Sequence, residues 1–496
     1  MRFFVSLKMI EIDWTESNIS CKRELLHNCD ESDTMIYRFN IMLNKHQNAL
    51  EYANTWMDII HRSELPDREN AQWIIDESIH NFSEHFNRGW LEQRKSVNTQ
   101  LNGWAAVEWS GDGAQFTDVL GRKYIDFLGG YGLMSLGWSH PEVVEAVRSQ
   151  LLCNPMPSQE LIDPLRGALA RIMADTLPGD ISYSFFAASG TEANEGAIKL
   201  AKLHTGKSAF IAATNGFHGK TMGSLSMMGK ALYREPVGQL YGGPVYHIPF
   251  GDADALEQQL QVCKSIGVGV AGVILEPIQW EAGAIVPPDD FWPRARELTK
   301  AYGTLLIADE VQTGLGRTGE LWWVDHWWVV PDIITTGKAL WGGVMPVSAF
   351  SSTPEIWESM MSPNPFIHTT TTGGGALACA AAIAAIRVVL RDNYAQQARE
   401  KWVYMKQRLQ VLAEKYPNIY THITWSGLLL GQHFVSHDIG YRVAAELFKR
   451  WVLVAGTLNS SKTIRIEPPI VITYAEIDEW LNRLEDALMA VSQSLL

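Results

Sequence analysis

Cysteine is scarce in this sequence and is never clustered. Five cysteines, at positions 21, 29, 153, 263 and 379, are spread over 496 residues, and no two form a CxxC pair. This spacing excludes a zinc ribbon and a framework of disulfides. A chain of this length buries a large core without such links. An odd and unclustered set of cysteines is typical of a reducing compartment, so we expect a cytoplasmic protein.

The sequence also has few long apolar runs and fewer basic than acidic residues. The longest apolar run, residues 376–386, is rich in alanine and reaches only about half of a membrane span. The opening residues 1–7 (MRFFVSL) lack the longer apolar core and cleavage site of a signal peptide. Lys and Arg total 41 against 55 Asp and Glu, a net charge of −14. We therefore expect no membrane segment and no nucleic-acid partner, because nucleic-acid binding needs a basic surface.

Short apolar runs that alternate with helical segments dominate the middle of the chain. Runs of strand length occupy residues 183–188, 209–213, 270–275, 304–308, 333–336 and 347–350, and helical patterns occupy residues 192–204, 291–301 and 376–390. Apolar strands in alternation with helices indicate a mostly parallel sheet that is covered on both faces. The sequence thus predicts an α/β fold for this part.

The two ends of the chain have a different pattern. Residues 1–75 are polar and carry no motif, so we expect an N-terminal extension of unknown role. An amphipathic helix is expected over residues 73–97, and short strands are expected over residues 107–109 and 124–128. Further along the chain we expect helices over residues 396–416 and about 475–488, with short strands around residues 428–430 and 463–466. The expected domains are residues 76–165 (N-terminal segment of a small domain, with a linker), 166–390 (large domain) and 391–496 (C-terminal part of the small domain).

Polar residues follow several of the expected strands, where open α/β sheets bind their ligands. Residues 189–192 (SGTE) follow the first strand and open a helix, so Gly190 and Thr191 form either an anion site or part of an ordinary helix cap. Asp309 ends a buried strand, where a carboxylate is either catalytic or paired with a cation. Lys338 follows another strand and is either a desolvated nucleophile for a carbonyl group or a surface lysine.

Two glycine-rich segments allow other interpretations. Residues 369–375 (TTTTGGG) either donate to a phosphate or form a flexible turn. Residues 314–319 (GLGRTG) fit the dinucleotide motif GxGxxG, but no convincing helix follows them. A nicotinamide-dependent oxidoreductase is therefore a weak alternative, and it leaves Lys338 without a role.

Taken together, these segments resemble the class III aminotransferases, which are pyridoxal-phosphate enzymes of fold type I. The resemblance runs from about Asn87 to the C-terminus, and it implies a large domain with a mostly parallel seven-stranded sheet between helices. A smaller α+β domain would come from the N- and C-terminal segments. The matching segments are residues 189–193 (SGTEA), 216–219 (GFHG), 276–279 (EPIQ), 309–314 (DEVQTG), 337–340 (GKAL) and 371–374 (TTGG).

The resemblance also implies roles around the cofactor, pyridoxal 5'-phosphate. Lys338 would join the cofactor aldehyde and then move a proton as base and acid. Asp309 would pair with the pyridine nitrogen, and Phe217 would stack on the ring. The remaining contacts implied are the phosphate for Gly190 and Thr191, the ring hydroxyl for Gln312, and the phosphate of a neighbouring subunit's cofactor for Thr371, which makes a homodimer the smallest active unit.

Four segments narrow the resemblance to the members of the class that act on diamines: residues 89–97, 158–166, 454–459 and 462–469. The implied reaction transfers an amino group from putrescine or a related diamine to 2-oxoglutarate. It gives glutamate and 4-aminobutanal, which cyclises to 1-pyrroline. Arg465 would bind the carboxylate of the oxo acid, and Glu281 would neutralise Arg465 when no carboxylate is present, because an unpaired buried Arg is costly. Tyr131 is expected either to line the amine pocket or to pack in the core.

Tryptophan is unusually common, with 19 residues against 17 Phe and 15 Tyr. Trp280 and Trp341 stand where the family has glycine, Trp138 stands where it has histidine, and residues 375–376 (GA) replace Asn-Pro. A glycine position is often one of positive φ or close approach, where a large side chain is strained. Trp280 and Trp341 therefore either repack harmlessly or narrow the pocket and weaken cofactor binding. The alternatives left open are another ω-amine, pyruvate as acceptor, and a non-catalytic homologue that folds and dimerises.

Overall fold

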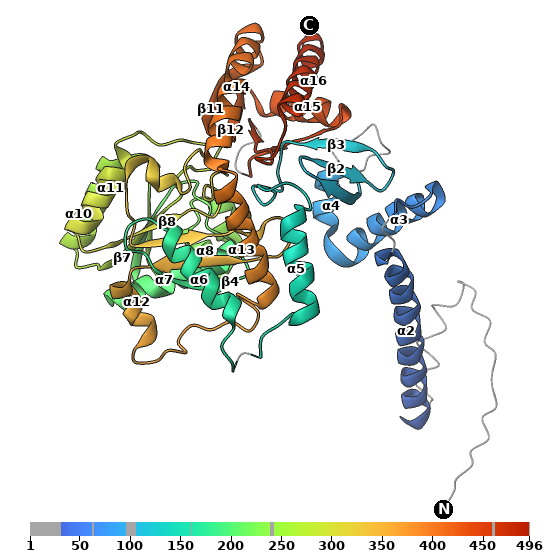
Figure 1. The fold of residues 1–496 in the computed structure, drawn as a ribbon, viewed down its shortest axis with the longest axis horizontal. Coiled ribbons are helices and arrows are strands. Elements are labelled where there is room, and N and C mark those ends of the chain that lie inside the picture. The colour runs from blue at the N-terminus through green and yellow to red at the C-terminus, as the bar shows by residue number, and fades with distance from the viewer. Residues whose placement is uncertain are drawn as a thin grey trace, which may run out of the picture. The chain divides into compact units, whose positions relative to one another are not determined.

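A computed structural model of the chain describes residues 31–61, 64–95, 106–158, 160–238, 243–458 and 462–495. The chain divides into two units, Met1–Pro66 and Asp67–Leu496. In the first unit the structure describes one long helix, α2 (Glu31–Ile60), whose side chains from residue 44 onward are mostly exposed (Figure 1). The second unit contains everything discussed below.

A seven-stranded sheet forms the centre of the second unit and confirms the predicted α/β fold. Its strand order is β4-β10-β9-β8-β7-β5-β6. β10 runs antiparallel to both of its neighbours, and the other neighbouring pairs are parallel. The strands are β4 (Tyr183–Ala187), β5 (Ala209–Ala213), β6 (Val245–Ile248), β7 (Val270–Leu275), β8 (Leu305–Asp309), β9 (Ile333–Thr336) and β10 (Ser348–Ser352).

Helices cover both faces of this sheet (Figure 1). Within β5, Ile211 belongs to the core on one face while Phe210 and Ala212 belong to the core on the other, as the period of two in a strand requires. One face packs against α6 (Pro164–Thr176), α10 (Ala253–Ser265), α11 (Phe291–Ala301) and α13 (Ala376–Arg391); the other packs against α7 (Gly190–Thr205), α8 (Met222–Met227) and α12 (Pro354–Met361).

A smaller α+β part is built from segments that are far apart in the sequence. β13 (Val452–Leu453) pairs in parallel with β3 (Lys123–Asp126), so the C-terminal segment completes a sheet that the N-terminal segment begins. This arrangement confirms the predicted origin of the small domain. The other strands and helices of the N- and C-terminal segments are β1 (Glu108–Asp112), β2 (Gln115–Asp118), β11 (Tyr420–Ser426), β12 (Leu429–Phe434), β14 (Ala455–Gly456), β15 (Thr463–Ile466), α5 (Pro141–Cys153), α14 (Tyr394–Lys415), α15 (His437–Lys449) and α16 (Tyr474–Gln493). The short helix α9 (Ala231–Arg234) lies instead between β5 and β6 of the large sheet.

The amphipathic helix predicted over residues 73–97 is continuous but not uniform. It consists of α3 (Arg68–Asn81), a π-helical turn η1 (Phe82–Asn87) and α4 (Arg88–Lys95), while residues 96–97 lie outside the described residues. Asp67 caps its start by accepting a hydrogen bond from the Asn70 N–H.

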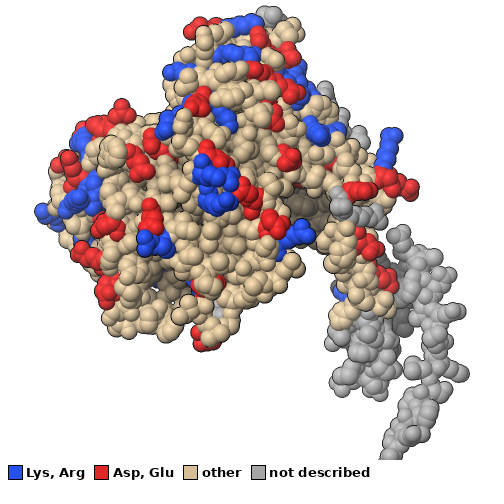
Figure 2. Space-filling view, viewed as in Figure 1, with Lys and Arg blue, Asp and Glu red and all other residues tan. Residues whose placement is uncertain are grey.

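Charged residues of both signs lie on the surface, and the lengths of the helices bear on membrane insertion. Lys and Arg side chains are interspersed with Asp and Glu over the face drawn in Figure 2. No helix among the described residues is long and apolar enough to cross a membrane.

The glycine motif at residues 314–319 does not form a dinucleotide-binding turn. Turns follow β8 here, and the next helical element is the short 3₁₀ segment η3 (Trp323–Trp327). Arg317, within the motif, is buried and donates hydrogen bonds to Ser135 Oγ (2.9 Å) and to the Pro468 carbonyl oxygen. Because a dinucleotide site needs a strand, a tight turn and a helix N-terminus, this segment serves packing instead.

Candidate active site

Three ionisable side chains meet at the carboxyl ends of three neighbouring parallel strands. Glu276 follows β7 directly, Asp309 is the last residue of β8, and Lys338 follows β9 after one glycine. The carboxyl edge of an open sheet is where α/β proteins bind ligands. Each of the three was brought here by the end of an apolar strand, which is the feature that the sequence shows most clearly.

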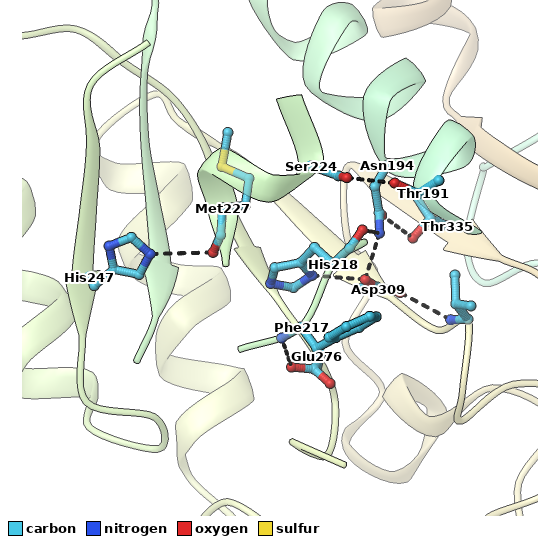
Figure 3. Close-up of polar contacts among 11 residues, drawn as sticks. Thr191, Asn194, Phe217, His218, Ser224, Met227, His247, Glu276, Asp309 and Thr335 are labelled. Carbon is cyan, nitrogen blue, oxygen red and sulfur yellow. Dashed lines mark hydrogen bonds and ion pairs between the residues drawn. The ribbon is translucent and has the colours of Figure 1, made fainter. Parts of the chain in front are cut away.

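Asp309 is buried and accepts several hydrogen bonds (Figure 3). Its Oδ2 accepts from Asn194 Nδ2 at 2.8 Å and lies 2.8 Å from His218 Nδ1, while its Oδ1 accepts from the Val311 N–H at 3.2 Å. Thr335 Oγ1 donates to Asn194 Oδ1 at 2.8 Å and so fixes which end of the amide faces Asp309. These donors orient the carboxylate and offset the cost of burying its charge.

Phe217 and His218 are held between two strand ends and a helix. The Phe217 N–H donates to Glu276 Oε1 at 2.7 Å, and Asn194 Nδ2 donates to the His218 carbonyl oxygen at 2.8 Å (Figure 3). Burial, and then the neighbouring Asp309 carboxylate, raise the pKa of Glu276 well above its usual range. This environment favours the neutral form of the Glu276 carboxyl group.

The N-terminus of α7 opens onto the same edge. Ser189 precedes the helix without capping it through its side chain, and Glu192 instead accepts from the Ala188 N–H (3.1 Å) and Ser189 Oγ (2.8 Å). A helix N-terminus presents unpaired N–H groups and a partial positive charge to an anion. Thr191 Oγ1 lies 2.8 Å from Thr221 Oγ1 and 2.6 Å from Ser224 Oγ, so a group of hydroxyls adjoins this terminus.

Two glycines keep this region free of side chains. A Cβ on Gly190 would lie 2.7 Å from Val311 Cγ1, and a Cβ on Gly219 would lie 2.2 Å from Thr191 Oγ1. Gly219 also has a φ of +120°, a conformation that side chains disfavour. A larger residue at either position would require a neighbouring side chain, Val311 or Thr191, to move.

Lys338 has an unusual backbone and an unusual environment. Its φ is +42°, in the left-handed region that non-glycine residues rarely adopt, and such strain is concentrated at functional sites. Burial lowers the pKa of the Lys338 ammonium, against the opposing effect of the Glu467, Glu281 and Asp309 carboxylates. No hydrogen bond or ion pair joins Nζ to another of the described residues. The amine is thus available as a nucleophile for a carbonyl group.

Arg465 and Glu281, predicted as a switchable pair, form a direct ion pair. Arg465 Nη1 donates to Glu281 Oε1 at 3.0 Å, and Nη2 donates to Oε2, so the contact is bidentate. The Leu458 N–H also donates to Glu281 Oε2 at 2.8 Å. Despite burial, these donors and nearby Lys338 lower the pKa of Glu281, so the carboxylate remains charged at neutral pH.

Aromatic rings and a second carboxylate surround Arg465. Its guanidinium lies 4.8 Å from the centre of the Tyr131 ring and 6.0 Å from that of Trp280. Trp280 Nε1 donates to Glu467 Oε2 at 3.1 Å, and Gln312 Nε2 donates to Glu467 Oε1. Tyr131 and Gln312 therefore lie in one cluster with Arg465, around a buried carboxylate that sequence reasoning did not single out.

Thr371 is the predicted site residue whose side chain lies on the surface of the chain. It is exposed in the segment that precedes α13. The following glycines lie against the end of β4, since a Cβ on Gly373 would lie 2.7 Å from the Phe186 carbonyl oxygen. The segment is thus fixed to the same edge of the sheet as α7.

Comparison with known proteins agrees with this geometry. The family described as "Aminotransferase class-III" matches residues 101–488. The chain is a class III aminotransferase. It is 45% identical, over 91% of its length and 97% of the relative, to a putrescine aminotransferase of Pectobacterium atrosepticum. Among solved structures it resembles the ornithine aminotransferase of Toxoplasma gondii (TM-score 0.73, 30% identity, 78% of this chain and 91% of that one). It also resembles an (S)-enantioselective omega-transaminase of Thermomicrobium roseum (TM-score 0.73, 28% identity, 78% of this chain and 93% of that one).

Class III aminotransferases use pyridoxal 5'-phosphate, and the residues present in this aminotransferase fit that cofactor. The glycine-lined N-terminus of α7 suits a phosphate, and Asp309 suits a ring nitrogen that carries a proton. Lys338, with its lowered pKa, suits an aldehyde. Nε2 of His218 is buried and has no hydrogen-bond partner among the described residues.

The tryptophans at unusual positions are accommodated in different ways. The backbone strain expected at Trp280 and Trp341 is not found, because neither is among the described residues with positive φ. Trp280 is fully buried with its indole bonded to Glu467, whereas the half-buried Trp341 has an indole N–H without a partner among the described residues. The Trp138 indole N–H donates a hydrogen bond to Asp126 Oδ2 at 2.8 Å. The Trp138 ring packs against Gly111, where an added Cβ would lie 2.5 Å from the ring.

Proposed function

We propose that this aminotransferase moves an amino group from putrescine or a related diamine to 2-oxoglutarate. The products are glutamate and 4-aminobutanal, which cyclises to 1-pyrroline with loss of water. The likeness to a putrescine aminotransferase supports the donor. The acceptor is supported by the position of Arg465 beside Lys338 and Glu281.

The closed Arg465–Glu281 pair is the observation that carries this proposal. Without a carboxylate ligand, the pair cancels its own charge and leaves the site open to an amine that has no carboxylate. When Glu281 turns away, the same guanidinium accepts a carboxylate in a bidentate contact. One site can therefore take a diamine and an oxo acid in turn, as transamination requires.

The chain's residues have defined tasks in this proposal. When bound, pyridoxal phosphate supplies the aldehyde that takes up nitrogen and a ring that withdraws electrons. Lys338 would hold the cofactor until substrate arrives and then, as an amine of lowered pKa, would take the proton from the substrate carbon that bears nitrogen. Asp309 stabilises a proton on the ring nitrogen.

The other predicted contacts complete the site. Phe217 would cover one face of the ring, and Gln312, which donates to Glu467, would contact the ring hydroxyl. Gly190 and Thr191 would bind the phosphate, and Tyr131, beside Arg465, would form a wall of the amine pocket.

Thr371 extends the proposal to a homodimer. Its exposed side chain lies on a segment fixed at the sheet edge, from which it would reach the phosphate of the partner subunit's cofactor. The reaction would take place in the cytoplasm, the compartment expected from the cysteine pattern.

Product analysis tests the proposed reaction. Cofactor-loaded protein mixed with putrescine and 2-oxoglutarate should form glutamate and 1-pyrroline in equal amounts, as measured by mass spectrometry. Parallel reactions with pyruvate, and with other ω-amines, rank acceptors and donors. Failure to form an amino acid from any of these pairs would contradict the proposal and favour a non-catalytic homologue.

A further inference from the structure

The Arg465 side chain is buried, and other described residues surround it. Its side chain is 1% exposed, both terminal nitrogens are bonded to Glu281, and Tyr131 and Trp280 lie over the guanidinium. A carboxylate ligand can reach this guanidinium only after Glu281 has left it. The affinity for carboxylates therefore depends on how firmly Glu281 is held.

Glu281 lies in a short turn that is closed at its base. Gln279 and Ile285 exchange backbone hydrogen bonds of 3.0 and 2.9 Å across this turn. Within it, the Trp280 carbonyl oxygen accepts from the N–H groups of Gly283 and Ala284, both at 3.2 Å. The residue before Glu281 thus organises the turn through its backbone.

The side chain of Trp280 ties the same turn to the strand that carries Arg465. Its indole is 1% exposed, and Nε1 donates to Glu467 Oε2 at 3.1 Å. Glu467 follows Arg465 by two residues at the end of β15, so its side chain lies on the same side of the extended chain. A single indole thereby contacts Glu467 through its N–H group and Arg465 through its ring.

We propose that Trp280 is a positioning residue that holds Glu281 on Arg465 and so makes the site discriminate against carboxylate ligands. The inference deepens the proposed function, since it assigns the balance between the amine and the oxo acid to one side chain. With the indole in place, the turn and β15 keep the spacing that the bidentate pair requires. Loss of the indole N–H would free the turn, and Glu281 would leave Arg465 at lower cost.

Binding of glutarate tests the inference without any turnover. Glutarate carries two carboxylates but neither an amine nor a carbonyl group that could react, so calorimetry on the cofactor-loaded protein reports the availability of Arg465. Trp280→Phe keeps an aromatic ring and removes the N–H. We expect it to bind glutarate about fivefold more tightly or better, at the lower end of typical coupling between linked groups. Trp280→Gly, which also removes the ring, should bind at least as tightly.

Two further variants make the result specific. Trp292→Phe is the matched control, because Trp292 is also fully buried but its indole N–H has no partner among the described residues and it packs against Trp323. Its affinity for glutarate should equal that of the wild type. Glu281→Gln weakens the ion pair directly and should tighten glutarate binding, which shows that the assay detects Arg465.

Steady-state kinetics supply a second readout. In Trp280→Phe the KM for 2-oxoglutarate should fall, while the KM for putrescine stays the same or rises. A purely structural defect would move both in the same direction. Glutarate affinity that is unchanged or weaker in Trp280→Phe, or a Glu281→Gln protein that binds no tighter, would overturn the inference. Failure of the proposed function would appear separately, as absence of turnover with putrescine in all variants including the wild type.

Discussion

At the scale of single residues, the site is a set of buried charges whose partners define their state. Asn194 and His218 both contact Asp309 Oδ2 and thereby fix the orientation of its carboxylate. Lys338, in contrast, has no bonded partner among the described residues and sits in a strained conformation. A fixed anion and a free amine are the two groups that the proposed chemistry needs.

Removal of the Asp309 charge should impair the reaction while the fold persists. Asp309→Asn keeps the size and part of the hydrogen bonding, but an amide does not stabilise a proton on the ring nitrogen. We expect kcat to fall at least about 100-fold, as for other losses of a preorganised electrostatic partner. The measurement is kcat per cofactor-loaded site.

A distant aspartate provides the control for that substitution. Asp332 is bound by both terminal nitrogens of Arg296, at 2.6 and 2.8 Å, at the opposite end of β9 from Lys338. Asp332→Asn should lower stability and leave kcat nearly unchanged. An Asp309→Asn protein with wild-type kcat would contradict the role of Asp309.

Sequence reasoning found the residues that end strands and missed those that support them. Asp309 and Lys338 were predictable because apolar strands point to them. Asn194 and His218 were not, because a polar residue inside a helix and a histidine in a loop have many ordinary explanations. The residues around Glu467 in the sequence do not predict that it is buried. It is buried because residues far away in the sequence, such as Trp280, pack against the end of β15.

At the scale of elements, the start of α7 determines how tightly the cofactor phosphate is bound. Gly190→Ala places a Cβ 2.7 Å from Val311 Cγ1 and pushes the helix start away from the loop after β8. We expect the dissociation constant for pyridoxal phosphate to rise at least about tenfold, equivalent to about 1.4 kcal/mol. Absorbance titration of the cofactor-free protein measures it.

Gly167→Ala is the matched control for Gly190→Ala. Gly167 lies in α6, and among the described residues no atom outside its chain neighbours and the helix backbone lies within 4 Å of the Cβ that alanine would add there. This substitution should leave cofactor affinity unchanged and raise the melting temperature slightly, because alanine restricts the unfolded chain. Equal cofactor affinity in both variants would argue against a phosphate site at Gly190.

The end of β8 also carries a pH-dependent contribution to stability. Burial raises the pKa of Glu310 to about 8, although Thr313 and the Val324 N–H donate to it. The unfolded chain has a Glu pKa of about 4.3, so between these two values the folded state binds more protons. The contribution of Glu310 to the free energy of unfolding is therefore fully present at acid pH. It falls as the pH rises toward 8, by up to about 1.4 kcal/mol per pH unit.

Glu310→Gln removes that dependence because the amide does not titrate. Between pH 5.5 and 7.5 the wild type should lose about 2 to 3 kcal/mol more unfolding free energy than Glu310→Gln, as measured with urea. Other buried carboxyls titrate alike in both proteins and cancel in the difference. Parallel pH profiles would show that Glu310 is ionised in the folded protein.

Strands and helices with a clear apolar run or helical period in the sequence were predicted correctly, whereas short or partly buried strands were not. The boundaries of β7, β9 and α11 agree with the apolar runs and the helical period in the sequence. β6 was missed because three of its four residues are only partly buried and it lies at the edge of the sheet. β2 was missed because it is short and lies between two turns.

At the scale of the whole molecule, the proposal requires two chains for each complete site. If Thr371 serves the partner subunit, a mixed dimer of a Lys338→Ala chain and a Thr371→Ala chain contains one intact site. That site combines Lys338 of one chain with Thr371 of the other. Two differently tagged chains, expressed together and purified through both tags, should have about half the activity of the wild type.

The parent dimers decide how the mixed dimer is interpreted. Dimers of Lys338→Ala alone should be inactive, and dimers of Thr371→Ala alone should be impaired at both sites. Activity of the mixed dimer that does not exceed the mean of the two parents would contradict the shared site.

The central claim is that this chain is an aminotransferase that binds pyridoxal phosphate through Lys338 and accepts a diamine. The visible absorption spectrum, recorded before and after addition of putrescine, tests it most directly. We predict a visible band that putrescine bleaches and 2-oxoglutarate restores, and that Lys338→Ala lacks. Absence of a visible band in the wild type after incubation with pyridoxal phosphate would contradict the claim. A band that no amine changes would contradict the catalytic part.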